Sequence, residues 1–449
     1  MTSGVTGADT PATKGPVEKL LTPFADVHQG EAASALMLTL LMFLLLSSYY
    51  MLKTAREVFI LSEGGAEVKS YAAAGQAVLL LVLVPAYSAF ASRVSRVQLV
   101  TWVSLFFASN ILLFTLAAGA HIRVGIAFFL WLGIYNVMVV AQFWAFANDI
   151  YTPAQGKRLF PLIGVGSSLG ALAGSIRAGR LMDAAGPLRL LIGGAAILVV
   201  CVGLARLIDR SARRTAPRQD AAKGDEPLGE GQTGFGLLLS NRYLTLIALL
   251  VILLNVVNST GEYLFGRYVV QNATDLYGAG AASEAARGRY IGETYSSFFS
   301  NINLIGLLLQ LFVVSAIFRT IGVGRALFIH PTIAGIGYLL MLRAPSFDAI
   351  RWIKTADNAV DYSLGNTTKR ALWLPTTRQE KYKAKQAVDS FCVRAGDVIQ
   401  AGIVYTGDLA SFSITVFAAL NVILTGAWLV VARGLNRRLK AQAGGGASL

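Results

Sequence analysis

The sequence predicts an all-α polytopic membrane protein with twelve transmembrane helices in two six-helix halves. Of its 449 residues, 55% are hydrophobic and only 14% are charged, whereas a soluble globular chain has about 25% charged residues. Uninterrupted apolar runs such as "SALMLTLLMFLLLSSYYML" and "IALLVILLNVVN" account for the difference. A run of about 20 apolar residues can cross a bilayer as an α-helix, so these runs indicate membrane spans.

Twelve candidate spans follow one another along the chain, and the tenth and eleventh are the most polar. They lie at residues 33–52, 70–92, 98–118, 124–147, 162–182, 188–206, 243–265, 294–317, 324–342, 347–364, 385–407 and 411–432. Residues 211–234 are rich in proline, glycine and charge, which is typical of a flexible linker. The predicted parts are therefore a 1–31 segment, a 32–210 half, the 211–234 linker, a 235–433 half and a 434–449 tail.

The net charge of +14 is distributed as the topology of a membrane protein requires. If the chain starts inside, most lysines and arginines fall in inside loops and in the C-terminal tail, and few fall in outside loops, among them Lys69 and Arg123. Cytoplasmic loops carry such an excess. Both termini are therefore expected in the cytoplasm, and the basic excess needs no nucleic-acid partner.

An aspartate, seven other residues and a Lys-Arg pair occur with the same spacing in both halves. The two sets are Asp149 with Lys157 and Arg158, and Asp361 with Lys369 and Arg370. We expect each aspartate to end a helix, the fourth or the tenth, and each basic pair to lie in the cytoplasmic loop that follows. The repeat favours duplicated halves, as in major-facilitator-like transporters, whose substrate site lies between the halves. These side chains either form a cytoplasmic gate or only anchor the loops inside.

Charged residues inside the predicted spans are the main indication of a functional site, because a charge at the centre of a membrane helix costs about 2.5–3.5 kcal/mol on insertion scales. Lys53 and Arg56 share a face where the first span closes, and Glu262 lies near the outer end of the seventh. The tenth and eleventh spans add Lys354, Asp357, Arg394 and Asp397. We predict that the cations bind an anion and that the acids balance them or carry protons. Structural ion pairing is the alternative.

No catalytic or metal-binding motif accompanies these charges. The three histidines lie in separate segments without the spacing of metal ligands. The stretch "GVGSSLGALAGS" places Gly166, Gly170 and Gly174 four residues apart, a spacing that lets membrane helices pack closely. It is not a phosphate-binding loop, because no Lys-Ser or Lys-Thr follows the glycines. Neither an enzymatic activity nor a cofactor nor a metal site is expected.

Four stretches carry a resemblance to a known family. They are "SSYYMLKTAREVFIL", "FWAFANDI", "DYSLGNTTKRALWLP" and "KAKQAVDSFCVRAGDVIQAG". Together they resemble segments of the ATP/ADP translocases of plastids and obligate intracellular bacteria. The resemblance implies a twelve-span nucleotide antiporter with a major-facilitator-like fold that binds ATP and works by alternating access. A multi-pass protein of a bacterial inner membrane is expected.

The sequence departs from the pattern of that family at several places. The lysine of the first-helix motif is replaced by Arg56, which keeps the charge. The glutamate of the fourth helix has no counterpart in residues 132–141, and the glutamate of the seventh is nearest to Asn258, with Glu262 one turn further on. The lysine of the eleventh helix is replaced by Asp397. The resemblance therefore implies a nucleotide or another anionic solute and leaves the substrate open.

Three hypotheses follow. The first is nucleotide exchange, with the base stacked on aromatic residues and the phosphates bound by cations. The expected substrate-binding residues are Lys53, Arg56, Asn258, Glu262, Lys354, Arg394 and Asp397, and the stacking candidates are Tyr49, Tyr50 and Trp144. The second is proton-coupled transport of another phosphorylated or organic anion, with Asp397 or Glu262 as the proton site. The third is a membrane enzyme or a non-transporting membrane scaffold, against which the missing catalytic motifs and the duplicated halves argue. The expected partners are a small anionic substrate and the lipid bilayer, and a monomer is expected.

Overall fold

The computed structural model describes residues 26–28, 31–91, 96–215, 234–343, 346–377 and 380–445. The helices of the first half are α2 (Ala32–Ala91), α3 (Arg96–Gly119), α4 (Gly125–Ile150), α5 (Pro153–Ala185) and α6 (Pro187–Thr215). Helix α2 is broken at Gly65, whose φ of 73° and ψ of −172° lie outside the helical region. The first two predicted spans therefore meet at one glycine rather than at a loop.

The second half contains both α-helices and π-helical turns. It begins with α7 (Gly234–Ser240), α8 (Arg242–Tyr277), the 3₁₀ turn η1 (Ala281–Ser283), α9 (Glu284–Leu308), the π-helical η2 (Leu309–Val313), α10 (Val314–Ala326) and α11 (Ile329–Met341). It continues with α12 (Phe347–Val360), the π-helical η3 (Asp361–Gly365), α13 (Asn366–Ala371), the π-helical η4 (Glu380–Ala384), α14 (Lys385–Ala387), the π-helical η5 (Val388–Cys392), α15 (Val393–Leu409) and α16 (Ile414–Gly445). Single π-helical turns inside α-helices are frequent at functional sites.

Among the described residues, eight helical stretches are long and apolar enough to cross a membrane. Helix α11 is apolar but shorter. The stretches from α12 to α13 and from η4 to α15, which contain the two most polar predicted spans, fall outside this set. The count of twelve spans therefore stays a prediction. Helix α8 continues to Tyr277, beyond the predicted end at 265, so Glu262 lies inside the helix and not near its end.

The structure also shifts the predicted boundaries of the linker and the tail. Helix α6 includes residues 211–215, and helix α16 extends through residues 434–445. The remainder of the linker up to residue 233, most of the 1–31 segment and residues 446–449 lie outside the described residues.

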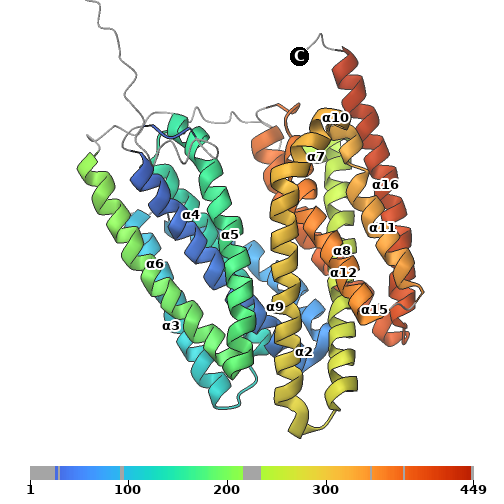
Figure 1. Ribbon diagram of the computed structural model, residues 1–449. Coiled ribbons are helices and arrows are strands. Elements are labelled where there is room, and N and C mark those ends of the chain that lie inside the picture. The colour runs from blue at the N-terminus through green and yellow to red at the C-terminus, as the bar shows by residue number, and fades with distance from the viewer. Residues whose placement is uncertain are drawn as a thin grey trace, which may run out of the picture.

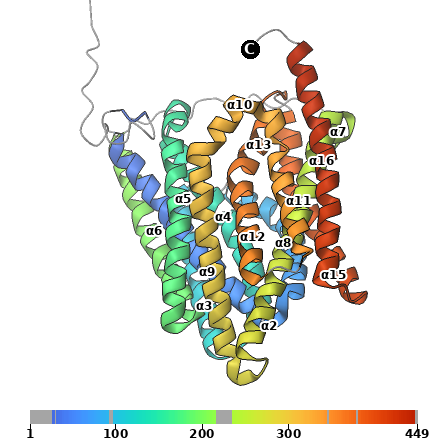
Figure 2. The same cartoon turned by 45° about the vertical axis from the view of Figure 1, so that its right-hand side comes forward.

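Figure 1 shows the helices gathered into two bundles, with α3 to α6 in one and α8 to α16 in the other. The start of α2 and the end of α16 lie at the same end of the molecule, which we call the terminal end. We call the opposite end the distal end. Helix α9 lies between α5 and α12 and contacts both, as Figure 2 shows. It therefore forms part of the contact between the two halves.

Helix α5 packs against α2 through the predicted glycine face. A Cβ at Gly170 would lie 2.8 Å from the Cα of Phe43, and one at Gly174 would lie 2.7 Å from the Cα of Ser47. These distances leave no room for a side chain, so the two backbones approach as closely as small residues allow. The packing role of Gly166, Gly170 and Gly174 is confirmed.

At the distal end, polar side chains of α2 after the bend bind the second bundle. The pairs are Tyr71 with Asp408 (3.0 Å), Ser70 with Gln400 (3.1 Å), Glu67 with Tyr263 (3.1 Å) and Glu67 with Arg267 (3.5 Å). We call these four contacts the distal clamp. They come from three residues within little more than one turn of α2 and reach α8 and α15, so they join the two halves on this side of the molecule.

The duplication of the halves is visible where two helical stretches begin. Thr152 and Gln155 form a capping box at the start of α5, and Thr377 and Glu380 exchange the same hydrogen bonds at the start of η4. Each box also bonds the chain just before the first long helix of its half, through the pairs Gln155–Glu31 (3.0 Å) and Glu380–Asn241 (2.7 Å). Helix α5 and the stretch from η4 to α15 therefore hold equivalent places.

The repeated aspartate and Lys-Arg spacing does not follow this duplication. Asp149 lies at the end of α4, as predicted, but Asp361 opens η3, well before that helical stretch ends at Ala371. The basic pairs lie on helices and not in loops: Lys157 and Arg158 near the start of α5, and Lys369 and Arg370 at the end of α13. The prediction of equivalent loop positions is wrong, because one set spans two helices and the other lies on a single continuous one.

Candidate functional site

Charged side chains of α2 lie at the contact between the two halves. Arg56 donates to the adjacent Glu57, with 3.0 Å from Nε to Oε1, and the Lys69 ammonium lies 2.7 Å from the other carboxylate oxygen of Glu57. Glu57 is 1% exposed, so two cations share one buried carboxylate. The placement of Lys69 in an outside loop is wrong, because α2 continues past Gly65 and Lys69 is buried.

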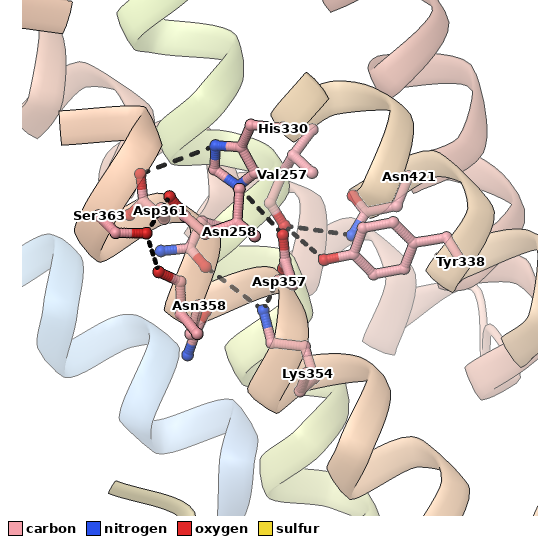
Figure 3. Close-up of polar contacts among 12 residues, drawn as sticks. Val257, Asn258, His330, Tyr338, Lys354, Asp357, Asn358, Asp361, Ser363 and Asn421 are labelled. Carbon is pink, nitrogen blue, oxygen red and sulfur yellow. Dashed lines mark hydrogen bonds and ion pairs between the residues drawn. The ribbon is translucent and has the colours of Figure 1, made fainter. Parts of the chain in front are cut away.

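Lys354 of α12 is fully buried and pairs with the acid one turn further along the same helix. Its Nζ lies 2.8 Å from Asp357 Oδ2, as Figure 3 shows. The same ammonium donates to Asn258 Oδ1 at 3.3 Å and lies 4.0 Å from Glu262 Oε1, both on α8. A buried ammonium costs several kcal/mol unless it is paired, so Asp357 makes this position tenable. Glu262 and Asn258, one turn apart on α8, therefore both contact the ammonium of Lys354.

Glu262 links the charges of α2 to those of α12. Its Oε2 lies 4.0 Å from Lys69 Nζ, and its Oε1 lies 4.0 Å from Lys354 Nζ. The Asn358 amide donates to Oε1 at 2.7 Å. With 25% of the side chain exposed, this carboxylate is more accessible than the other acids around it. One carboxylate therefore lies between a lysine of each half.

Lys53 differs from the other cations of α2. Among the described residues, no carboxylate lies within 4.0 Å of its ammonium. The ammonium lies 4.1 Å from the ring centroid of Phe299, on α9, and 5.2 Å from that of Tyr50. A cation over an aromatic ring gains about 0.5–2 kcal/mol, but its charge is not neutralised. Lys53 therefore brings an uncompensated positive charge to the contact between the halves.

These side chains form one group, which we call the interhalf cluster. Its members are Lys53, Arg56, Glu57 and Lys69 of α2, Asn258 and Glu262 of α8, and Lys354, Asp357 and Asn358 of α12. The cluster has four cations and three carboxylates, which leaves an excess of one positive charge (4 − 3 = 1). Between low-dielectric walls such an excess attracts negatively charged solutes. The arrangement therefore fits an anionic ligand.

Arg394 and Asp397 form a separate pair on α15. The Arg394 Nη1 lies 3.6 Å from Asp397 Oδ2. Asp397 Oδ1 accepts hydrogen bonds from Asn255 Nδ2 at 2.8 Å and from Ser259 Oγ at 3.2 Å, both on α8. These contacts join α15 to α8 within the second half. Of the expected binding residues, the structure therefore brings together Lys53, Arg56, Asn258, Glu262 and Lys354. The α15 pair instead contacts α8 at Asn255 and Ser259, which flank Asn258.

The three stacking candidates lie at different places. Tyr50 is nearest to the cluster, since Lys53 lies over its ring. Tyr49 contacts Tyr50 edge-on, with 5.4 Å between ring centroids. Trp144 packs against Phe160 of α5 at 5.2 Å, inside the first bundle. Only the two tyrosines of α2 are thus close to the cations of the interhalf cluster.

The predicted gate residues of the first half include an ion pair within that half. Arg158 binds both carboxylate oxygens of Glu31, at 3.0 and 2.9 Å. Burial raises the pKa of the Glu31 carboxyl, but hydrogen bonds from Arg158, the His28 backbone and Gln155 outweigh it and hold the pKa at about 2. Glu31 is therefore ionised at physiological pH, and the pair ties the chain before α2 to the start of α5.

The gate residues of the second half line a cavity. Lys369 lies 3.4 Å from Asp361 on the same helical stretch. Both residues, together with Arg370, line a cavity of about 320 Å³ between α8, α13 and the stretch from η4 to α15. Asn258 of the interhalf cluster also lines it. The cavity therefore extends from the predicted gate residues to the cluster.

Sequence reasoning missed His330, which lies on α11 and is 5% exposed. Its Nε2 lies 3.1 Å from Asp357 Oδ1, beside the interhalf cluster. The aspartate follows 27 residues later in the chain, and the residues around His330 on α11 are mainly apolar, so no spacing pattern connects the two. The available signal was a histidine inside an otherwise apolar helix.

The chain is similar to known nucleotide carriers. The model of the TLC ATP/ADP transporter family matches residues 128–349. ADP,ATP carrier protein 1 of Chlamydia muridarum is 25% identical over 336 residues, which are 67% of this chain and 62% of the carrier. The plastidic ATP/ADP-transporter of Solanum tuberosum is 24% identical over 343 residues, 67% of this chain and 51% of that protein. The matched region thus spans less than two thirds of these relatives.

Solved transporter structures share the fold. The nucleoside transporter NupG superposes with a TM-score of 0.64 at 13% identity, covering 89% of this chain and 98% of NupG. An auto-inhibited POT family peptide transporter gives 0.63 at 11% identity, covering 89% and 97%. These likenesses confirm the all-α, major-facilitator-like architecture. The chain is therefore a multi-pass helical membrane protein of this architecture, and residues 128–349 are similar in sequence to the TLC ATP/ADP transporters.

Proposed function

We propose that this chain exchanges ATP and ADP across a membrane by alternating access between its two halves. The observation that carries the proposal is the uncompensated ammonium of Lys53, which lies near Arg56 at the contact between the halves. The phosphates of a nucleotide would complete the charge balance there. The names of the relatives, ADP,ATP carrier and plastidic ATP/ADP-transporter, support a nucleotide as the substrate.

The members of the interhalf cluster take different roles in this proposal. Lys53, Arg56 and Lys354 attract the phosphates, and Glu262 balances their charge while the site is empty. The ring of Tyr50, beside Lys53, is the nearest stacking surface for the base. Arg394 and Asp397 act indirectly, since their contacts hold α15 against α8.

The proposed orientation places the terminal end in the cytoplasm of a bacterium, with both termini inside and two six-helix halves in the inner membrane. The distal clamp then closes the site toward the outside. The cavity lined by Lys369 and Arg370 is the proposed route by which an anion reaches the cluster from the cytoplasm. The carrier works as a monomer, because its site is built from the two halves of one chain.

The experiment that tests the proposal uses the full chain in proteoliposomes, with labelled ATP and ADP outside and either nucleotide or none inside. Lys53→Gln should raise the apparent KM for ATP at least tenfold, since losing one partner of a desolvated charged contact costs about 2–5 kcal/mol. Lys440→Gln, which removes an exposed ammonium on α16, is the matched control. Normal exchange by Lys53→Gln would place the anion elsewhere. A folded wild-type chain that moves no nucleotide would support a scaffold.

A further inference from the structure

His330 lies between two carboxylates from the neighbouring helix. Its Nε2 is 3.1 Å from Asp357 Oδ1, and its Nδ1 is 3.8 Å from Asp361 Oδ1, as Figure 3 shows. An ionised carboxylate only accepts hydrogen bonds, so Nε2 carries the hydrogen toward Asp357. In a neutral ring the lone pair of Nδ1 then faces Asp361. A second proton at Nδ1 would turn that repulsive approach into an ion pair.

His330 lies in the middle of a row of charged side chains. Lys354 Nζ lies 2.8 Å from the second oxygen of Asp357, and Lys369 Nζ lies 3.4 Å from Asp361 Oδ1. From α16, the Trp428 ring meets the imidazole edge-on, with 4.8 Å between centroids. Among the described residues, no other charged side chain contacts His330. With a neutral imidazole the row has no net charge, and one added proton makes it +1.

A small cavity lies beside His330. It measures about 20 Å³ and is lined by His330, Thr368, Lys369 and Trp428, among others. Two buried polar atoms among its lining residues have no hydrogen-bond partner, His330 Nδ1 and Thr368 Oγ1. A cavity needs at least about 10–15 Å³ to hold a water molecule with polar partners, so one water fits here.

Lys369 connects this small cavity to the larger one. It lines both, and Asp361 also lines the cavity of about 320 Å³. A proton arriving in the larger cavity can therefore reach Nδ1 over Asp361 or over one water beside Lys369. The backbone favours this arrangement, because a Cβ at Gly365 would lie 3.1 Å from His330 Nδ1 and 3.0 Å from Asp361 Oδ1. A glycine in η3 lets the ring and the carboxylate approach each other.

We propose that His330, held between Asp357 and Asp361, is a proton-binding site and that substrate transport by this chain is coupled to the proton bound there. The coupling, which rests on the proposed function, passes through Asp357. A charged His330 competes for this carboxylate, so Lys354 is held less firmly and is freer to attract an anion at the interhalf cluster. Histidine suits the role, since its charge changes between about pH 5 and 8.

Proton binding is tested first, without any nucleotide, on the full chain in detergent. Trp428 contacts His330, so protonation of the ring should change the fluorescence of this tryptophan as the pH is lowered. The fluorescence step should be present in the wild type and absent from both His330→Gln and Trp428→Phe. His121→Asn, which removes an exposed histidine in the turn after α3, should keep it. A wild type without the step, or a step that survives in His330→Gln, would overturn the site.

Coupling is tested in proteoliposomes without internal nucleotide, under a pH gradient that is acid outside. One pH unit is a tenfold ratio of proton activity, so one coupled proton can concentrate labelled ATP up to about tenfold. His330→Gln should lose this accumulation while ATP/ADP counterflow at equal pH persists. Wild-type counterflow without any effect of the gradient would refute the coupling and leave the exchange function standing. Absence of nucleotide movement, with the fluorescence step present, would refute the exchange function and leave the proton site standing.

Discussion

Replacing Glu262 with glutamine removes the carboxylate that lies between a lysine of each half. At 4.0 Å and an effective dielectric constant of about 20, its attraction to each of Lys69 and Lys354 is about 4 kcal/mol before desolvation is counted. The interhalf cluster would then have four cations and two carboxylates. We expect a bound nucleotide to supply the missing negative charge, so Glu262→Gln should lower the apparent KM for ATP about tenfold, which corresponds to about 1.4 kcal/mol.

The same substitution should slow the empty carrier more than the loaded one. Proteoliposomes report this difference directly, since exchange needs internal nucleotide and net uptake requires the empty carrier to return. Net uptake by Glu262→Gln should fall by a larger factor than exchange. Glu262→Asp, which keeps the charge, should restore part of the loss. A raised KM, with net uptake and exchange reduced by the same factor, would contradict this reasoning. It would show that Glu262 binds the substrate and does not merely replace its negative charge in the empty site.

Three further predictions follow from the packing and the charges. Gly170→Ala should lower the melting temperature in detergent, because the new Cβ meets the backbone of α2, whereas Gly164→Ala, with nothing within 4 Å, should not; equal effects would refute the packing argument. Glu31→Gln should lower the melting temperature by the same amount at pH 5.5 and at pH 8. The pKa of the Glu31 carboxyl is held at about 2, so the stabilisation by its ion pair with Arg158 is lost only as the pH falls below about 4.3 toward 2. Reporters fused within 211–234 or after Arg438 should report the cytoplasm, and an external signal at either place would reverse the proposed orientation.

The fold and most charged residues of the site could be predicted from the sequence, because each follows from the free-energy cost of placing a given stretch of residues in water or in a membrane. Long apolar runs have few stable places outside a bilayer, and ions inside such runs are retained only where they are paired or used. Lys53, Arg56 and Lys354 could be singled out on this ground. Lys69 was misplaced, because the second span was predicted to begin only at residue 70, whereas the helix bends at Gly65 and continues.

The contacts between distant residues could not be predicted. Nothing in the chain connects His330 with Asp361, or Glu262 with Lys69, before the helices pack. The equal spacing between each aspartate and the Lys-Arg pair that follows it led to a wrong prediction of equivalent positions. Spacing along a chain does not specify where a helix ends. Two capping boxes, at Thr152 and at Thr377, mark equivalent positions of the halves more reliably, since a cap fixes the start of a helix.

The pairing of charges within single helices bears on how the chain enters the membrane during synthesis. Arg56 with Glu57, Lys354 with Asp357, and Arg394 with Asp397 are each neighbours on one helix. Such pairs can form as soon as the helix does, before any partner helix has left the ribosome. Each polar segment then presents little net charge to the translocon, which lowers the insertion cost of its ions. The two halves can therefore be inserted one after the other and meet afterwards. Within the described part of the chain, the ammonium of Lys53 then has no carboxylate within 4.0 Å in either half.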